Sequence, residues 1–145
     1  MKKRDNILEV KFPSLSRNES LARSLVSAFL MNLDPTVSEV ADHKCAVSEA
    51  VTNCIVHGYR ENCGIVYMKL ECSDRTVQIE IRDKGCGIAD ISRAMEPLYT
   101  TDPEGERSGM GFTVMESFCD KVRVVSREGK GTKVVLTKKL ARLDL

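Results

Sequence analysis

Alternating apolar and polar residues predict the strands of this chain. Over 7–12 every second residue is apolar, which is the period of a strand with one buried face. Two more strands are predicted over 65–70 and 77–82. A final pair over 122–127 and 132–137 is joined by the turn Glu-Gly-Lys-Gly, which predicts a β-hairpin.

A first helix is predicted from residue 16 to about residue 33. Ser16 and Glu19 have the spacing of a capping box, in which each side chain bonds the other residue's backbone N–H. Helical spacing assigns its core-facing side to four apolar residues: Leu21, Leu25, Ala28 and Phe29.

A second helix is predicted over 36–57. Asp34 is a suitable N-cap, Pro35 fits the first helical position, and Gly58 ends the helix. Its core face is formed by Val40, Val47, Val51, Cys54 and Ile55.

The second half of the chain adds two further helices, over 88–95 and 109–120, separated by a polar loop at 100–108. The strand pairs lack crossover helices between them, which favours a mixed, mostly antiparallel sheet. With the helices on one face, we expect an α/β (α+β) two-layer sandwich.

Length and charge narrow the function classes. A chain of 145 residues fits one domain over 1–145 whose core needs no disulfide or metal. The formal net charge is only +1, which argues against direct nucleic-acid binding. No membrane span and no signal peptide are visible, so we expect a cytoplasmic protein with no membrane partner.

The six cysteines predict packing rather than a zinc site or a disulfide framework. No Cys-x-x-Cys pair occurs and there are only two histidines, whereas zinc sites usually show close ligand pairs. Disulfide scaffolds belong mainly to secreted chains. We therefore expect reduced thiols that behave as small apolar side chains.

Glu49 and Asn53 are the first candidates for chemistry. They are four residues apart on the second helix, so they project from one face, away from its apolar stripe. A carboxylate beside an amide oxygen can bind a hard cation such as Mg²⁺ or pair a general base with a metal ligand. An ordinary solvated helix face has the same appearance.

Asp83 ends an apolar strand and begins the sequence Asp-Lys-Gly-Cys-Gly. The glycines allow a sharp turn and close approach of the backbone to a ligand. The Asp83 carboxylate could accept a hydrogen bond from the exocyclic amine of a nucleobase. A tight turn with a solvated aspartate is the plainer interpretation.

Arg-Ser-Gly-Met-Gly at 107–111 opens the last helix. Helix N-termini present free N–H groups and a positive dipole end to phosphate, and the loop before it is long enough to close as a lid. A glycine-rich helix entry without a ligand is the alternative. Neither a P-loop nor a GxGxxG motif is present.

Taken in order, these three motifs resemble the N, G1 and G2 boxes of the GHKL superfamily, which includes gyrases, Hsp90-type chaperones, histidine kinases and MutL. The segments SEAVTNCIVHGY, RDKGCGI and PLYTTDPEGERSGMGFTVMESF resemble its anti-sigma kinase branch. The resemblance covers nearly the whole chain and is greatest to the sporulation anti-sigma-F factors. It implies a Bergerat-type ATP-binding fold.

The resemblance also implies roles for single residues. Glu49 corresponds to the catalytic base and Asn53 to the Mg²⁺ ligand. Asp83 corresponds to the acid that reads the adenine amino group, with Gly85 and Gly87 in the adenine-side turn. The remaining ATP-binding positions are Thr100, Thr101, Arg107, Ser108, Gly109, Met110, Gly111 and Thr132, and the partner-binding position is Arg23.

The implied protein is an anti-sigma factor and serine/threonine kinase. It would hold a sigma factor of the sigma-F type away from RNA polymerase, and use Mg²⁺ and ATP to phosphorylate a serine of an anti-anti-sigma factor, working as a homodimer. Three alternatives stay open: a stress-response anti-sigma kinase, a histidine kinase catalytic domain, and a non-catalytic, ATP-gated binding module. No dimerisation helices with a phospho-acceptor histidine precede the boxes, which disfavours the histidine kinase.

Overall fold

The computed structural model of the chain describes residues 6–60, 62–88, 95 and 111–142. The strands are β1 (Asn6–Pro13), β2 (Ile65–Ser73), β3 (Thr76–Asp83), β4 (Lys121–Arg127) and β5 (Gly131–Lys139). The helices are α1 (Asn18–Met31), α2 (Val37–Thr52), its π-helical continuation η1 (Asn53–Gly58), and α4 (Gly111–Phe118).

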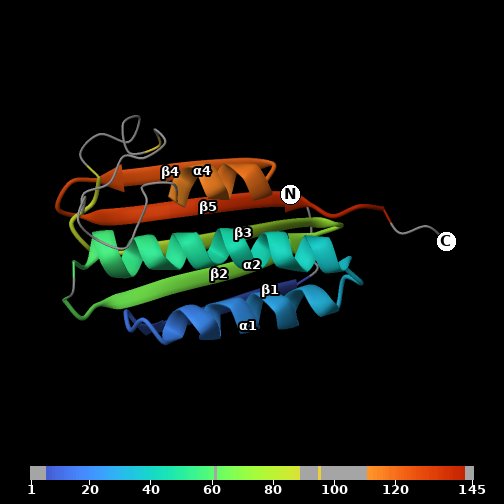
Figure 1. The fold of residues 1–145 in the computed structure, drawn as a ribbon, viewed down its shortest axis with the longest axis horizontal. Coiled ribbons are helices and arrows are strands. Elements are labelled where there is room, and N and C mark those ends of the chain that lie inside the picture. Colours follow the sequence, from blue (N-terminus) through green and yellow to red (C-terminus); the bar gives the residue numbers. More distant parts are fainter. Residues whose placement is uncertain (1–5, 61, 89–94, 96–110, 143–145) are drawn as a thin grey trace.

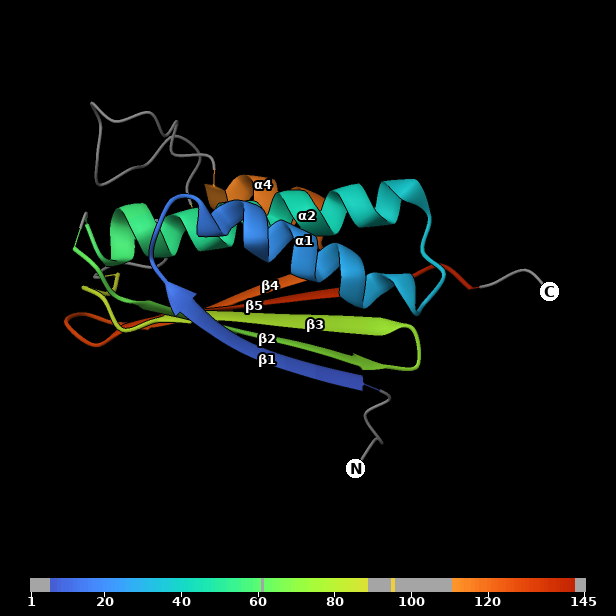
Figure 2. The same cartoon turned by 90° about the horizontal axis from the view of Figure 1, so that it is seen from below.

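The five strands form one sheet in the order β1-β2-β3-β5-β4, and every neighbouring pair is antiparallel (Figure 1). Figure 2 shows α1, α2 and α4 together on one face of this sheet. The predicted two-layer sandwich is therefore confirmed, and the sheet is antiparallel throughout. None of the helices in the described part of the chain has the length and apolar character that a bilayer crossing requires.

The core lies between the two layers. It is built from the inward side of each strand and the facing side of each helix, including Val26, Leu30, Val47, Val51, Leu70, Ile79, Ile81, Met115 and Leu136. Strand alternation predicted the sheet side of this core correctly, because a two-residue period leaves only one choice of face.

The core face of α1 agrees with the prediction at Leu25 and Phe29 and differs from it at Leu21 and Ala28. Ala22, Val26, Phe29 and Leu30 are buried, whereas Leu21 is 44% exposed and Ala28 is also exposed. The helix is rotated because Ala22 and Val26 complete an apolar stripe with Phe29 and Leu30 at spacings of three and four residues.

The predicted cap of α1 is also wrong. Arg17 is the N-cap residue and has no side-chain cap hydrogen bond. The Glu19 carboxylate is instead bonded to Arg23, Ser48 and Thr52, so α1 exchanges a local cap for contacts with α2.

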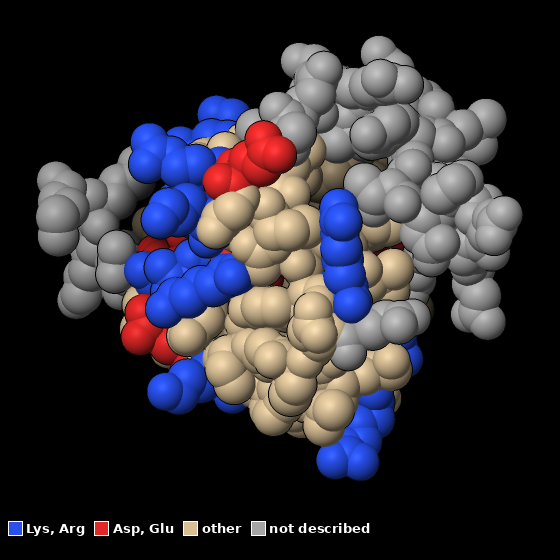
Figure 3. Space-filling view, turned by 90° about the vertical axis from the view of Figure 1, so that its left-hand side faces the viewer, with Lys and Arg blue, Asp and Glu red and all other residues tan. Residues whose placement is uncertain are grey.

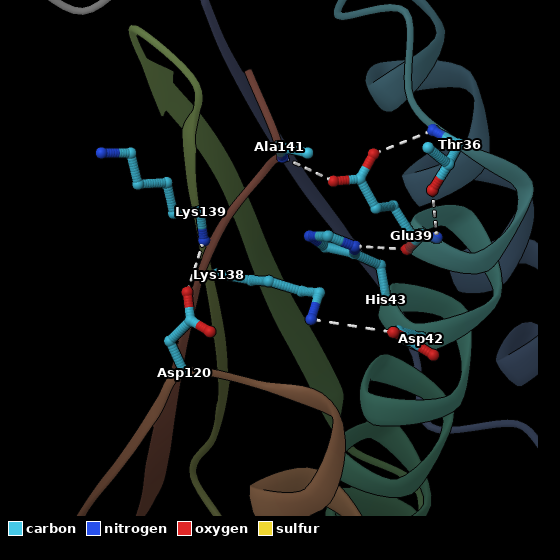
Figure 4. Close-up of polar contacts among 8 residues, drawn as sticks. All are labelled: Thr36, Glu39, Asp42, His43, Asp120, Lys138, Lys139 and Ala141. Carbon is cyan, nitrogen blue, oxygen red and sulfur yellow. Dashed lines mark hydrogen bonds and ion pairs between the residues drawn. The ribbon is translucent and has the colours of Figure 1, made fainter. Parts of the chain in front are cut away.

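The cap of α2 lies two residues later than predicted. Thr36 is the N-cap, and it forms a capping box with Glu39, while Asp34 adopts a left-handed conformation with φ +49°. Figure 4 shows that the other Glu39 oxygen accepts the backbone N–H of Ala141 at 2.7 Å. The start of α2 is thus fastened to the segment that follows β5.

The predicted helix over 36–57 ends in a different geometry. Beyond Thr52 the chain widens into η1, where the Tyr59 N–H donates to the Cys54 carbonyl five residues back, at 2.9 Å. π-helical turns are rare and often occur at functional sites. The helix predicted over 88–95 lies outside the described residues except for its two end residues.

All six cysteines are free thiols. Cys54 and Cys72 are buried, Cys45 and Cys63 are exposed, and Cys86 and Cys119 are half-buried.

Candidate functional site

Glu49 and Asn53 lie side by side where α2 passes into η1, and both face the first residue of α4. A Cβ built on Gly111 would lie 3.4 Å from Oε2 of Glu49 and 3.3 Å from Oδ1 of Asn53. Both side chains are half-buried, so they do not form a solvated helix face. The helical spacing of four residues brings two oxygens of different chemistry to one place.

Asn53 has an unsatisfied buried atom. Its Nδ2 is buried and has no hydrogen-bond partner among the described residues. Buried polar groups are nearly always hydrogen-bonded, and an exception requires an explanation such as a missing ligand or water. The Asn53 amide is thus placed to hydrogen-bond a ligand or a water at this position.

Asp83 is the second element of the site, at the end of β3. Its side chain is buried, with the residue only 4% exposed, and its carboxylate accepts the Gly85 N–H at Oδ1, at 2.9 Å. Burial raises the pKa of the Asp83 carboxyl, and the neighbouring Gly85 N–H, Cys54 thiol and Thr132 backbone offset the effect only in part.

Gly58 lies directly against this carboxylate, and the sequence interpretation missed its role. A Cβ on Gly58 would be 2.9 Å from Cγ, Oδ1 and Oδ2 of Asp83. From the sequence Gly58 appeared only to end the helix. No signal in the sequence alone distinguishes a glycine that stops a helix from one that leaves room for a carboxylate.

The turn after Asp83 is clamped between η1 and the β4–β5 turn. On one side, the Cys86 N–H donates to the Gly58 carbonyl at 2.9 Å and the Lys84 N–H donates to the Tyr59 hydroxyl at 2.9 Å. On the other, the Gly129 N–H donates to the Cys86 carbonyl at 2.6 Å. The turn is therefore positioned by protein contacts on both sides.

Gly85 and Gly87 serve this packing. A Cβ on Gly85 would be 2.0 Å from the Gly58 carbonyl oxygen, and one on Gly87 would be 2.2 Å from that of Arg127. Gly87 also has φ +74°, a conformation that favours glycine. The close approach that the sequence predicted is thus, in the described residues, an approach to protein backbone.

Thr132, one of the predicted ATP-binding positions, lies opposite Asp83 in the β3–β5 ladder. Its hydroxyl is 2.7 Å from that of Ser126, and the Ser126 hydroxyl in turn accepts the Ile88 N–H at 2.7 Å. Ser126 therefore links the β4–β5 hairpin to the chain that follows the Asp83 turn.

Several predicted positions fall outside the described residues: Thr100, Thr101, Arg107, Ser108, Gly109 and Met110. Of the predicted glycine-rich helix entry, Gly111 is described, and it begins α4.

Arg23 lies on the side of α1 that faces α2. Its guanidinium is 3.0 Å from the Glu19 carboxylate and 3.2 Å from the Ser48 hydroxyl, and 38% of its side chain is exposed. Ser48 directly precedes Glu49, so Arg23 contacts the helix that carries the candidate site. It is a partly exposed arginine held in an ion pair and not a freely solvated one.

The end of the molecule that carries these turns is basic. Figure 3 shows this end, where Lys and Arg side chains lie around an uncharged centre and acidic side chains are fewer. Lys84, Arg127 and Lys130 are exposed on its turns. A local excess of positive charge favours an anionic ligand.

Comparison with known proteins agrees with this geometry. Residues 12–138 match the family described as the histidine kinase-like ATPase domain. The anti-sigma F factor of Clostridium acetobutylicum is 53% identical over 140 residues, which cover 97% of this chain and 98% of that protein. The anti-sigma F factor of Bacillus subtilis is 51% identical over 138 residues, covering 94% of each chain.

A solved structure shares the fold. The crystal structure of the RsbU and RsbW domains of Rv1364c from Mycobacterium tuberculosis matches with a TM-score of 0.70 at 20% identity, over 95% of this chain and 33% of that one. The resemblance in fold thus extends to a protein of much lower sequence identity. By its sequence and its fold, the chain belongs to the histidine kinase-like ATPase domain family and, within it, to the anti-sigma F factors.

Proposed function

We propose that this protein is an anti-sigma factor that also acts as an ATP-dependent protein serine kinase. Its sigma partner would be of the sigma-F type, by analogy with the named relatives, and binding would keep that factor from RNA polymerase. The kinase substrate would be an anti-anti-sigma factor, inactivated by phosphorylation of a serine. We place the protein in the cytoplasm of a sporulating bacterium, as a homodimer with one domain per chain.

One observation supports phosphoryl transfer above all others: the Glu49 carboxylate and the Asn53 amide converge beside Gly111. Nucleotide binding alone does not need a carboxylate there, because a negative charge beside phosphates is unfavourable. A general base is needed when a serine hydroxyl must lose its proton.

In the proposed reaction, the serine oxygen of the partner attacks the γ-phosphorus of ATP. The bond to the β–γ bridging oxygen breaks, ADP leaves, and Glu49 accepts the hydroxyl proton. Asp83 accepts a hydrogen bond from the adenine amino group at the other end of η1. The residues at 107–111 and Thr100 and Thr101 would surround the phosphates.

The donor set at Asn53 fits Mg²⁺. The ion prefers oxygen ligands and usually keeps few from the protein, so the Asn53 Oδ1 would hold it together with the ATP phosphates. Among the described residues no group of three or more His, Cys, Asp or Glu side chains could hold a metal by itself, which agrees with a metal that arrives with the nucleotide. When bound, Mg²⁺ neutralises phosphate charge.

The test is phosphorylation of the anti-anti-sigma protein from the same genome, with labelled ATP and Mg²⁺. Phosphoserine on the partner, formed about 10²-fold or more slowly by Glu49→Gln, is the expected result. ATP binding and sigma-factor binding without any phosphoserine would contradict the kinase and favour the non-catalytic, ATP-gated module. If a stress-response sigma factor binds more tightly than a sigma-F type factor, only the proposed sigma partner changes and the proposed kinase activity stands.

A further inference from the structure

Three side chains form a row across the end of the sheet that carries Asp83. Thr132 on β5 lies directly opposite Asp83 on β3, and it also lies directly opposite Ser126 on β4. Directly opposite residues of an antiparallel pair project from the same face of the sheet. Asp83 is buried against Gly58 of η1, so all three side chains of the row lie on the face that the helices cover.

Ser126 has two partners of fixed hydrogen-bonding character. The Ile88 N–H can only donate, and its nitrogen lies 2.7 Å from the Ser126 hydroxyl oxygen. The Gly131 carbonyl can only accept, and its oxygen lies 3.0 Å from the same hydroxyl. A serine hydroxyl has one proton and two lone pairs. The Ser126 proton is therefore assigned to the Gly131 carbonyl, one lone pair to the Ile88 N–H, and one lone pair is left.

This assignment decides the direction of the hydrogen bond between Ser126 and Thr132. The two hydroxyl oxygens are 2.7 Å apart, a hydrogen-bond distance at which one of them must donate. Since the Ser126 proton is used by Gly131, Thr132 is the donor. The Thr132 hydroxyl then presents lone pairs, and not its proton, to a group that binds beside Asp83.

We propose that Ser126 is a positioning residue for base selection: by accepting the Thr132 proton it keeps the Thr132 hydroxyl an acceptor, so that the site selects a purine with a 6-amino group over one with a 6-oxygen. The proposal rests on the proposed function of Asp83 as the acceptor for adenine. An ionised carboxylate is likewise only an acceptor. Two neighbouring acceptors suit an amino group, which has two protons, and oppose a carbonyl oxygen, which has none.

A threonine hydroxyl without this constraint would not discriminate between the two bases. It could rotate to donate to a 6-oxygen or to accept from a 6-amino group, because a hydroxyl does both. Ser126→Ala removes the acceptor of the Thr132 proton and frees this rotation, while the Asp83 carboxylate is unchanged. We therefore expect the ratio of ATP affinity to ITP affinity to fall.

The test measures this ratio by calorimetric titration of ATP and ITP, with Mg²⁺, against wild type, Ser126→Ala and Ser126→Thr. The base of ITP carries a 6-oxygen where adenine carries its amino group. We expect Ser126→Ala to lower the ratio about five- to tenfold, the effect of one hydrogen bond. Ser126→Thr keeps the hydroxyl and should keep the wild-type ratio. A serine that only braces the β4–β5 hairpin would change both affinities by the same factor, and that result would overturn the proposal.

Thr132→Val isolates the route through Thr132. It removes the hydroxyl with a side chain of similar shape and leaves the bonds of Ser126 to Ile88 and Gly131 in place. Thr132→Val should lower the ratio, and adding Ser126→Ala to it should lower the ratio no further, because residues that act through one contact are not additive. An unchanged ratio in Thr132→Val, or a further fall in the double variant, would contradict the proposal even if Ser126→Ala alone failed to fold.

Thr137→Val is the matched control. Thr137 lies on the same strand as Thr132, toward its other end, opposite Gln78 and Lys121. This variant should keep the wild-type ratio. If wild type itself binds ITP as tightly as ATP, the proposed adenine site is wrong. If wild type prefers ATP and Ser126→Ala keeps that preference, the site stands and only the role of Ser126 is overturned.

Discussion

Gly58→Ala is the most direct perturbation of the candidate site. The new methyl group would meet three atoms of the Asp83 carboxyl at 2.9 Å, whereas non-bonded carbon contacts are optimal at about 3.5–4.0 Å. Half an ångström or more must be gained by moving either η1 or the carboxylate. The Asp83 carboxylate is buried and accepts the Gly85 N–H at 2.9 Å, so movement there disturbs a packed and hydrogen-bonded group.

Two opposing effects set the size of the change. Gly58 does not have a positive φ, so alanine is free of backbone strain and should favour the helical turn by about 0.5–1 kcal/mol. Overpacking in a tight site costs about 1–3 kcal/mol. We therefore expect a net loss of up to about 2 kcal/mol in unfolding free energy, and a fall in ATP affinity of about tenfold or more as the carboxylate is displaced.

Calorimetric titration with ATP and thermal unfolding of the same samples measure the two quantities. Gly129→Ala is the control, because nothing lies within 4 Å of its Cβ position, although its φ of +78° makes alanine strained. Gly129→Ala should lose stability but lower ATP affinity less than Gly58→Ala does, because, among the described residues, its only link to the site is the hydrogen bond from its N–H to the Cys86 carbonyl. Gly58→Ala with ATP affinity within about twofold of wild type would refute the reasoning.

Three further predictions concern the base, the partner surface and pH. Glu49→Gln should keep ATP affinity and lower the phosphorylation rate by about 10²-fold or more, and an unchanged rate would exclude Glu49 as the base. Arg23→Ala should weaken binding of the sigma factor or the anti-anti-sigma factor by tenfold or more, as an interface arginine does, without changing ATP titrations, whereas the exposed Arg17→Ala should change neither. Burial, with the Lys138 charge, holds the pKa of His43 below 6.5 despite its hydrogen bond to the Glu39 carbonyl and the nearby acid groups of Glu39 and Asp42 (Figure 4). The unfolded chain therefore takes up the proton first, and the unfolding free energy should fall as pH drops below about 6.5. In urea unfolding measured from pH 7 to 5, His43→Leu should show a smaller change of unfolding free energy with pH.

The sheet could be predicted from sequence because its signal is local and has a single solution. Val77, Ile79 and Ile81 are apolar at every second position, and all three are buried. The face of α1 was harder, since Leu21 and Ala28, seven residues apart, both widen the apolar stripe on the same side. Only packing against α2 decides which side is buried.

Caps and site geometry depended on contacts that the sequence does not display. Asp34 and Thr36 are both good caps, and the choice of Thr36 follows from its capping box with Glu39, which also holds Ala141 more than a hundred positions along the chain. Glu49, Asn53 and Asp83 were predicted from their spacing and order. The close approach of Gly58 to Asp83 could not be, because it arises from the widened turn of η1.

That widened turn has a consequence for comparing this chain with its relatives. A π-helical turn uses one residue more than the α-helical turn that it replaces. Helical wheels drawn at 3.6 residues per turn therefore hold for α2 as far as Thr52, and positions within η1 are displaced in phase. A relative with an ordinary α-helical turn here would need a one-residue alignment gap between Asn53 and Gly58.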